Sequence, residues 1–260
     1  MAIVLDSLPA QVLAFLWPLV RVAAMLMVAP VLGSRAIPAR VRVGVAVLIT
    51  MVLYPTLTSN LPPHPTAAYG VLITAQEFIL GLVTGFLTRL VFAAFEVAGT
   101  VIATQMGLGF AALTDPQNGG QIPVLSQFFA VVVTLLFLAL DGHLLLVRLL
   151  AISFQEVPVG ELRFDRDGIW QLLGWGKHVF SGALLIALPA ITSLTVVNLA
   201  FGVMTRVAPQ MNLFAVGFPI TLLLGLVVVM FGLPTLFPHL ESLLESAVET
   251  LGSILANWAG

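Results

Sequence analysis

The sequence contains few charged residues and no cysteine. Only 8% of its 260 residues are Asp, Glu, Lys or Arg, against about 25% in an ordinary soluble domain. A soluble protein of this size needs more charge to cover its surface, so the composition argues strongly against a soluble globule. The absence of cysteine excludes disulfide bonds and thiolate metal sites. The net charge of −2 comes without a basic run, so no nucleic-acid partner is expected.

The residues that are present are mostly apolar. Hydrophobic residues make up 60% of the chain, and its mean hydropathy is +1.11. A membrane hydrocarbon core about 30 Å thick requires about 20 apolar residues per spanning helix. Runs of that order are Leu8–Leu32, Val43–Leu57, Ala67–Thr104, Pro123–Ala151, His178–Met204 and Leu213–Phe237. The runs lack the alternation of barrel strands, so we predict an all-α, multi-helix bundle of the integral membrane type with broken helices, in one domain spanning 1–260.

The third apolar run is about twice the length that one membrane span requires. It carries Glu77, Arg89 and Glu96. Two alternatives fit: a pair of helices with a tight turn near Arg89, or one long bent helix. Glu77 has the further alternative of lying near a membrane interface, with its carboxylate reaching water. The charged segment Pro158–Gly168 is interpreted as an aqueous loop.

Charged residues within the apolar runs are candidates for buried contacts. An arginine or aspartate at the centre of a membrane helix costs about 2.5 to 3.5 kcal/mol, so each should have a partner or water. The predicted contact residues are Arg21, Arg89, Glu96 and Asp141. Arg89 and Glu96 share a helix face but lie about 10 Å apart along it, which favours partners on other helices or subunits. We expect Arg21 to make a charge-assisted contact inside an assembly, with stacking on Trp17 as the alternative.

The motifs that indicate catalysis are absent from the sequence. It has no HExxH zinc motif and no GxSxG nucleophile turn, and its histidines are too scattered to pair on one helix face. We therefore predict a protein that is not an enzyme and has neither cofactor nor metal. A small-solute secondary transporter is the alternative, because broken helices and charges within the membrane are typical of that class. However, the break at Gly107 and Gly109 has no clear polar counterpart in the C-terminal half.

Three long segments of the sequence are distinctive: RVAAMLMVAPVLGSRAIPARVRVGVAVLIT at Arg21–Thr50, QMGLGFAALTDPQNGGQIPVLSQFF at Gln105–Phe129, and APQMNLFAVGFPI at Ala208–Ile220. In this order, the three segments resemble the FliR family of flagellar type III export-gate proteins. The resemblance covers nearly the whole chain. The GLGFA sequence in the second segment is closer to the flagellar members than to their virulence-injectisome relatives.

This resemblance implies a subunit that assembles with FliP and FliQ into a helical entry gate beside FlhB. The gate would lie in the bacterial inner membrane, at the flagellar basal body, in contact with membrane lipid. Unfolded flagellar export substrates would pass through it on leaving the cytoplasm. In that family the apolar helices build the assembly and need not cross the bilayer as hydropathy indicates.

The resemblance also implies that the loop matching Met106–Gly120 projects into the central pore as a plug. The residues predicted to form it are Met106, Gly107, Leu108, Gly109, Phe110, Leu113, Asp115, Pro116, Gly119 and Gly120. Their chemistry fits that role, because bulky and adaptable apolar side chains exclude water and glycines permit backbone angles closed to other residues. The alternative is a flexible connection between two helices, packed beneath lipid headgroups.

Overall fold

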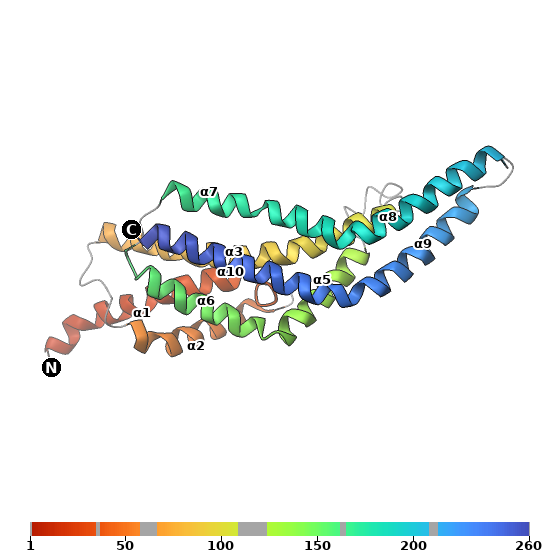
Figure 1. Cartoon of the computed structure of the whole chain (residues 1–260). Coiled ribbons are helices and arrows are strands. Elements are labelled where there is room, and N and C mark those ends of the chain that lie inside the picture. The colour runs from red at the N-terminus through yellow and green to blue at the C-terminus, as the bar shows by residue number, and fades with distance from the viewer. Residues whose placement is uncertain are drawn as a thin grey trace. The chain divides into compact units, whose positions relative to one another are not determined.

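The computed structural model describes residues 2–34, 37–57, 67–108, 124–161, 165–207 and 213–259. Within these residues it contains helices and no strand (Figure 1). The α-helices are α1 (Ala2–Val28), α2 (Ala39–Leu57), α3 (Ala67–Gln105), α5 (Val124–Ala139), α6 (Gly142–Glu156), α7 (Arg166–Trp175), α8 (Lys177–Val207), α9 (Leu213–Gly232) and α10 (Leu236–Ala259), and the short 3-10 helix η3 is Leu233–Thr235. The predicted all-α fold of the membrane type is confirmed.

Several of these helices are suited to crossing a membrane. In the described part of the chain, four helical stretches are long and apolar enough: Ala39–Leu57, Tyr69–Gln105, Arg166–Val207 and Gly217–Ala259. A fifth arises if α5 and α6 together form one broken span. The 39 residues of α3 extend over about 58 Å, close to twice the thickness of a hydrocarbon core of about 30 Å. Hydropathy alone therefore does not fix how deeply such a helix lies in the bilayer.

The two longest apolar runs of the sequence differ in continuity. Helix α3 passes through Arg89 without a break, so the alternative of one long helix is correct. By contrast, the run Pro123–Ala151 is interrupted between α5 and α6, whose axes differ by 69°. Asp141 adopts the left-handed conformation there, with φ 54°. Any Cβ at Gly142 would overlap the ring of Phe137, so the sharp turn depends on that glycine.

The charged segment Pro158–Gly168 is not simply an aqueous loop. Helix α7 begins within it at Arg166, and the Asp165 side chain caps α7 by accepting a hydrogen bond of 3.1 Å from the Asp167 amide. Val159 is buried. The interpretation as an aqueous loop is therefore wrong in part, because mixed charges do not reveal that Val159 and Gly168 are buried.

The chain divides into two compact units. Unit 1 comprises Met1–Leu90, Phe137–Gly176 and Leu244–Gly260. Unit 2 comprises Val91–Leu136 and Lys177–Leu243. Each unit combines segments that are distant in sequence, and α3 contributes residues to both. The expectation of one domain over 1–260 stays a prediction.

Unit 1 contains a densely buried core, in which α1 packs against α2. Its largest buried side chains include Trp175, Trp258, Met25 and Arg21. The indole of Trp258 packs against Gly168 and donates a hydrogen bond of 3.2 Å to the Asp165 carbonyl. An arginine with no exposed surface is the unusual member of this set.

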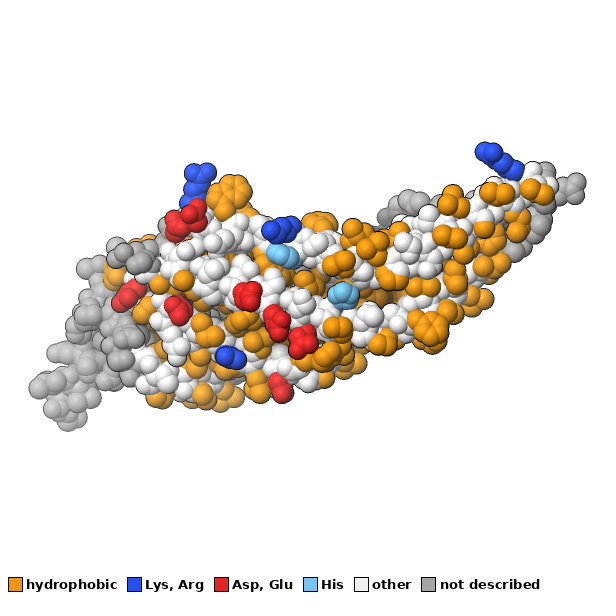
Figure 2. All heavy atoms as spheres, in the orientation of Figure 1, with side chains coloured by type: hydrophobic (Ala, Val, Ile, Leu, Met, Phe, Trp, Pro, Cys, Tyr) orange, Lys and Arg blue, Asp and Glu red, His pale blue; other side chains and the backbone are white. Residues whose placement is uncertain are grey.

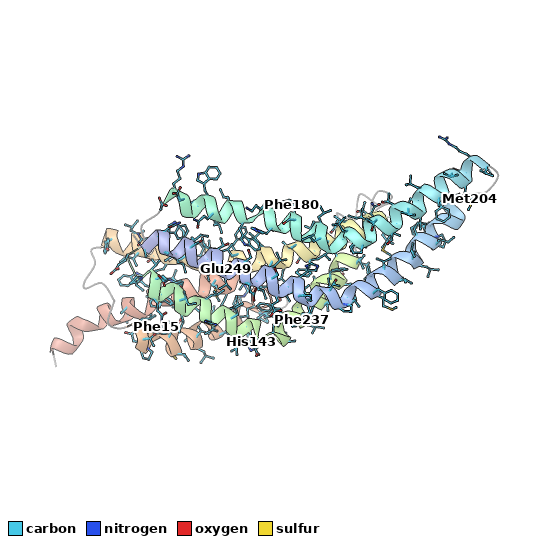
Figure 3. All side chains as sticks on the ribbon, in the orientation of Figure 1. Phe15, His143, Phe180, Met204, Phe237 and Glu249 are labelled. Atoms are coloured by element: carbon cyan, nitrogen blue, oxygen red, sulfur yellow. The ribbon has the colours of Figure 1, made fainter. Side chains whose placement is uncertain are left out.

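Unit 2 is dominated by a hairpin in which α8 and α9 pack side by side (Figure 1). Apolar side chains are spread along the hairpin's visible face (Figure 2). Val203 is 65% exposed and Leu223 is 63% exposed. Met204 lies towards the far end of the hairpin, and Phe180 lies near the start of α8 (Figure 3). The hairpin therefore presents apolar surface that unit 2 itself does not cover.

Candidate functional site

A fully buried ion pair joins α1 to α3 in unit 1. Arg21 Nε donates to Glu77 Oε2 at 2.7 Å, and Arg21 Nη2 donates to Glu77 Oε1 at 2.9 Å. Both side chains have 0% of their surface exposed. This two-pronged geometry is the strong form of an arginine–carboxylate contact. A single substitution of either residue would leave the other charge buried and without its partner.

Other N–H donors of the Arg21 guanidinium bond to backbone carbonyl groups at and just after the end of α6. Nη1 donates to the Ser153 carbonyl at 2.7 Å, and Nη2 donates to the Val157 carbonyl at 3.0 Å. The guanidinium also lies 4.1 Å from the centre of the Phe154 ring, a favourable cation–π distance. Arg21 on α1 thus connects three segments that are far apart in sequence, namely α1, α3 and the end of α6 with Val157 after it.

Glycines on α3 allow α1 to approach closely enough for this pairing. Glu77, Gly81 and Gly85 follow at intervals of four residues and so share one helix face. A Cβ at Gly81 would overlap the Arg21 carbonyl, and a Cβ at Gly85 would lie 2.6 Å from the Met25 carbonyl. Small residues at this spacing are a known means of close helix contact in membranes. The GLVTG sequence at Gly81–Gly85 was the signal that could have identified the pairing.

The structure corrects two expectations about Arg21. Its charge-assisted contact is made within the chain, to Glu77, so it needs no second subunit. The ring that stacks on it is Phe154, where the sequence indicated Trp17. Glu77 does not reach water, because it is fully buried. The ion pair is therefore a structural element of unit 1, enclosed away from solvent.

The other predicted charge contacts are not brought together with Arg21. Arg89 and Glu96 are half-buried on α3, and each makes an interaction within the structure. They fall in different units. Asp141 is exposed and lies in the turn between α5 and α6. Its place at a turn differs from the expectation of a charge within an apolar helix.

The root of the predicted plug loop is the C-terminal end of α3, in unit 2. Gly107 has φ 81°. Its amide donates to the Thr104 carbonyl at 3.0 Å, and the Leu108 amide donates to the Ala103 carbonyl at 3.0 Å. This pair of hydrogen bonds is the Schellman arrangement, in which a left-handed glycine ends a helix. Gly107 therefore acts as a helix cap.

Most of the predicted plug lies outside the described residues. These residues are Gly109, Phe110, Leu113, Asp115, Pro116, Gly119 and Gly120. The structure describes three residues of the predicted plug, Met106, Gly107 and Leu108. Met106 is 1% exposed, and the other two are half-buried. The plug role itself stays a prediction.

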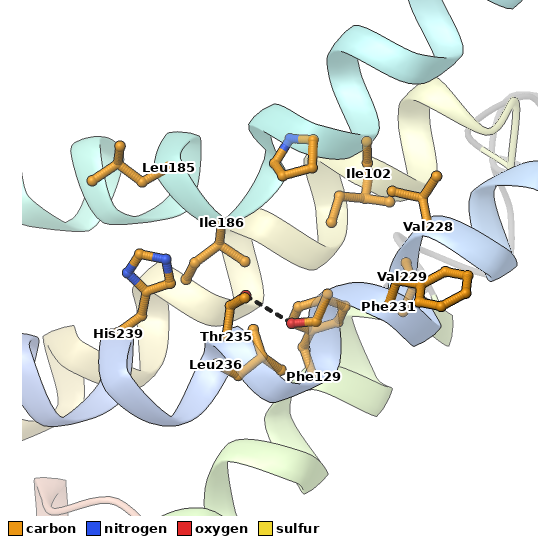
Figure 4. Close-up of a pocket in the computed structure, with 13 residues that line it drawn as sticks. Ile102, Phe129, Leu185, Ile186, Val228, Val229, Phe231, Thr235, Leu236 and His239 are labelled. Carbon is orange, nitrogen blue, oxygen red and sulfur yellow. Dashed lines mark hydrogen bonds between the residues drawn. The ribbon is translucent and has the colours of Figure 1, made fainter.

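Unit 2 also contains a cavity of about 340 Å³, shown in Figure 4. Its walls include Ile102, Phe129, Ile186 and Val229, with His239 and Thr235 among its few polar side chains. The Thr235 hydroxyl donates to the Gly232 carbonyl at 2.7 Å. Such a lining offers few partners for a polar solute. Among the described residues, no group of three or more His, Cys, Asp or Glu side chains could hold a metal ion.

Comparison with known proteins gives one consistent family. Residues 12–247 match the family described as bacterial export proteins, family 1. The chain is 40% identical to the flagellar biosynthetic protein FliR of Pectobacterium carotovorum over 93% of this chain and 92% of the relative. It is 36% identical to FliR of Escherichia coli K12, with the same two coverages. It is 28% identical to FliR of Bacillus subtilis 168 over 97% of each chain.

Proposed function

Because the chain belongs to the FliR family of flagellar export proteins, we propose that it is a non-enzymatic subunit of the flagellar type III export gate. It assembles with FliP and FliQ, beside FlhB, in the bacterial inner membrane at the flagellar basal body. Together they form the channel through which unfolded flagellar proteins leave the cytoplasm. The observation that carries this proposal is the family match over residues 12–247, which leaves little of the chain for another function.

The exposed apolar helices support a role inside an assembly. Leu199 on α8 is 67% exposed and Phe231 on α9 is 73% exposed. Soluble monomers rarely expose contiguous apolar patches of more than a few hundred Å². In this proposal, neighbouring gate subunits and lipid cover these faces. The apolar cavity of unit 2 gives no corresponding support to the transporter alternative, since it offers little to hold a polar solute.

The first experiment tests the export role. A strain lacking this chain should stop secreting flagellar proteins, and the intact chain supplied in trans should restore secretion. Co-purification with FliP and FliQ measures assembly. Normal secretion in the deletion strain would contradict the proposal, and a changed uptake of small solutes in the same strain would favour a transporter.

We further propose that the loop following Leu108 closes the channel at rest. Apolar side chains gate a pore by excluding water, and shortening them admits it. Deleting Gly109–Leu113 removes bulk and leaves the Gly107 cap of α3 in place. In cells that contain the complete gate, we expect this deletion to raise the leak of ions and small osmolytes before it stops protein export.

A pair of substitutions gives the matched form of this experiment. Phe110→Ser, combined with Leu108→Ser, should also raise the leak. Phe180→Ser is the control, because it removes an aromatic ring that is 72% exposed on α8 and lies outside the loop. A leak equal to wild type in the loop variants, in cells shown to contain assembled gate, would leave the loop as a connector between helices.

A further inference from the structure

The side chain of Met106 occupies a notch on α9 within unit 2. The notch exists because residue 225 is a glycine. A Cβ placed at Gly225 would lie 2.5 Å from Met106 Cγ, 2.7 Å from its sulfur and 2.8 Å from its Cε. These distances are too short for real contacts, so the thioether lies flat against the bare backbone of α9. Met106 is 1% exposed as a result.

A second contact on the same face of α9 involves the next residue of the chain. The ring of Phe218 lies 3.2 Å from the position that a Cβ at Gly107 would take. Phe218 and Gly225 are two helical turns apart, so both face the end of α3. Gly107, which lies beside the Phe218 ring, is also the residue that caps α3 with φ 81°. The end of α3 is therefore held by α9 at two consecutive residues.

We propose that Gly225 is a positioning residue: it seats Met106 against α9 and so fixes the point from which the loop after Leu108 departs. The contact of Met106 and Gly107 with Gly225 and Phe218 is named here the Met106 anchor. The anchor is static, because a buried side chain interlocked with a glycine and a hydrogen-bonded helix cap leave no space for movement. Only the consequence for pore closure rests on the proposed function.

A cysteine pair tests the contact directly, because the chain has no cysteine of its own. Met106 Cγ lies 2.5 Å from the Cβ position at Gly225, and one carbon–carbon bond adds about 1.5 Å. The two Cβ atoms are thus no more than about 4.0 Å apart, which a disulfide can bridge. Met106→Cys with Gly225→Cys should cross-link on oxidation, and the oxidised gate should export as well as its reduced form. Failure to cross-link, or export that stops on oxidation and returns on reduction, would overturn a static anchor.

Enlarging the glycine tests its positioning role. Gly225→Val should displace Met106, so that a cysteine at position 108 (Leu108→Cys) reacts severalfold faster with a maleimide in membranes containing the assembled gate. Gly232→Val is the matched control on the same helix, because a Cβ at Gly232 meets nothing within 4 Å. Met106→Ala should rescue Gly225→Val by vacating the space that valine needs. Equal labelling rates for Gly225→Val and Gly232→Val would overturn the assignment.

The assay of osmolyte leak distinguishes the Met106 anchor from the proposed plug. If the anchor positions a plug, Gly225→Val should also raise the osmolyte leak, and Met106→Ala should reverse that rise. If deletion of Gly109–Leu113 causes no leak but the labelling and cross-linking results hold, the anchor stands and the plug fails. If that deletion leaks but Gly225→Val changes neither labelling nor leak, the plug stands and the anchor fails.

Discussion

Helix α3 and the α8–α9 hairpin are similarly apolar but are covered very differently. In the most apolar window of α3, 61% of the residues are buried, against 17% in the stretch containing α8 and 22% in the stretch containing α9. The hydropathy of a helix shows that burial away from water is favourable. It does not show whether the same chain, another protein or lipid replaces the water around the helix. For α3 the replacement is largely this chain, whereas the described residues of this chain leave most of the hairpin uncovered.

The packing around several glycines shows the same difference between α3 and the hairpin. On α3, Gly81 and Gly85 meet the backbone of α1, and Gly99 meets the backbone of α5. On the hairpin, Gly202 and Gly232 have nothing within 4 Å. A glycine in a helix costs about 1 kcal/mol relative to alanine, which close packing offsets on α3. Gly202 and Gly232 have no such close packing among the described residues, whereas Gly225 of the same hairpin packs against Met106.

The largest effect is expected where α3 buries charge. Arg21→Leu should destabilise unit 1 by about 3 to 5 kcal/mol, because it leaves Glu77 buried without its partner. Chemical unfolding of the gate in detergent would measure the loss. Arg206→Leu on α8 is the control, since Arg206 is exposed. The double variant Arg21→Leu with Glu77→Leu should recover much of the loss, and a double variant no more stable than Arg21→Leu would show that Arg21 acts mainly through its carbonyl contacts.

The next effect concerns the close approach of α1 to α3. Gly85→Leu places a side chain where Met25 of α1 and Ala29, just after α1, already lie, and such overpacking costs about 1 to 3 kcal/mol. Gly70→Leu is the control on the same helix, because that position is open. The same unfolding measurement applies. Equal stability of the two variants would mean that α1 can move away from α3 at little cost. The contrast in burial between α3 and the α8–α9 hairpin would then matter less for stability.

The sequence predicted the kind of fold better than its connections. Apolar runs located the helices, because hydrophobic length is a local property that twenty residues can display. The sequence identified Arg21 as a buried charge but did not identify Glu77 as its partner. The two lie 56 residues apart, and composition cannot pair distant residues. The spacing of Glu77, Gly81 and Gly85 was the signal that could have shown that α1 packs against this face of α3.

Turns and loops were the harder part of the prediction. The Asp141–Gly142 dipeptide is an ordinary turn signal, yet the apolar residues on both sides concealed the break between α5 and α6. The segment after α6 carries charges, but its Val157 carbonyl serves Arg21 inside unit 1. Of the predicted plug, the structure describes only the exit from α3, where Gly107 has the positive φ of a glycine that ends a helix; the plug stays a prediction.

A smaller effect is expected where α3 continues into unit 2. The Ser126 hydroxyl on α5 donates to the Glu96 carbonyl at 2.7 Å, beside the contact of Gly99 with the Ser126 backbone. Ser126→Ala removes this hydrogen bond and should cost about 1 kcal/mol. Ser193→Ala on α8 is the control, because its hydroxyl bonds only within its own helix, to Pro189. A cost for Ser193→Ala as large as that for Ser126→Ala would show that the contact between α5 and α3 adds nothing particular.

The smallest effect on the stability of the separate chain is expected for a substitution on the hairpin. The same substitution in the complete gate shows whether protein or lipid covers the hairpin. Leu199 is 67% exposed on α8, whereas Leu87 is 1% exposed on α3. In the separate chain in detergent, Leu199→Ala should change the free energy of unfolding by less than about 0.5 kcal/mol, and Leu87→Ala should cost about 2 to 5 kcal/mol. In the complete gate, Leu199→Ala should become costly if a neighbouring subunit encloses that side chain, since a cavity then forms between proteins. Lipid tails would instead fill the space, and the cost would stay small. A large loss for Leu199→Ala already in the separate chain would remove the contrast between α3 and the hairpin.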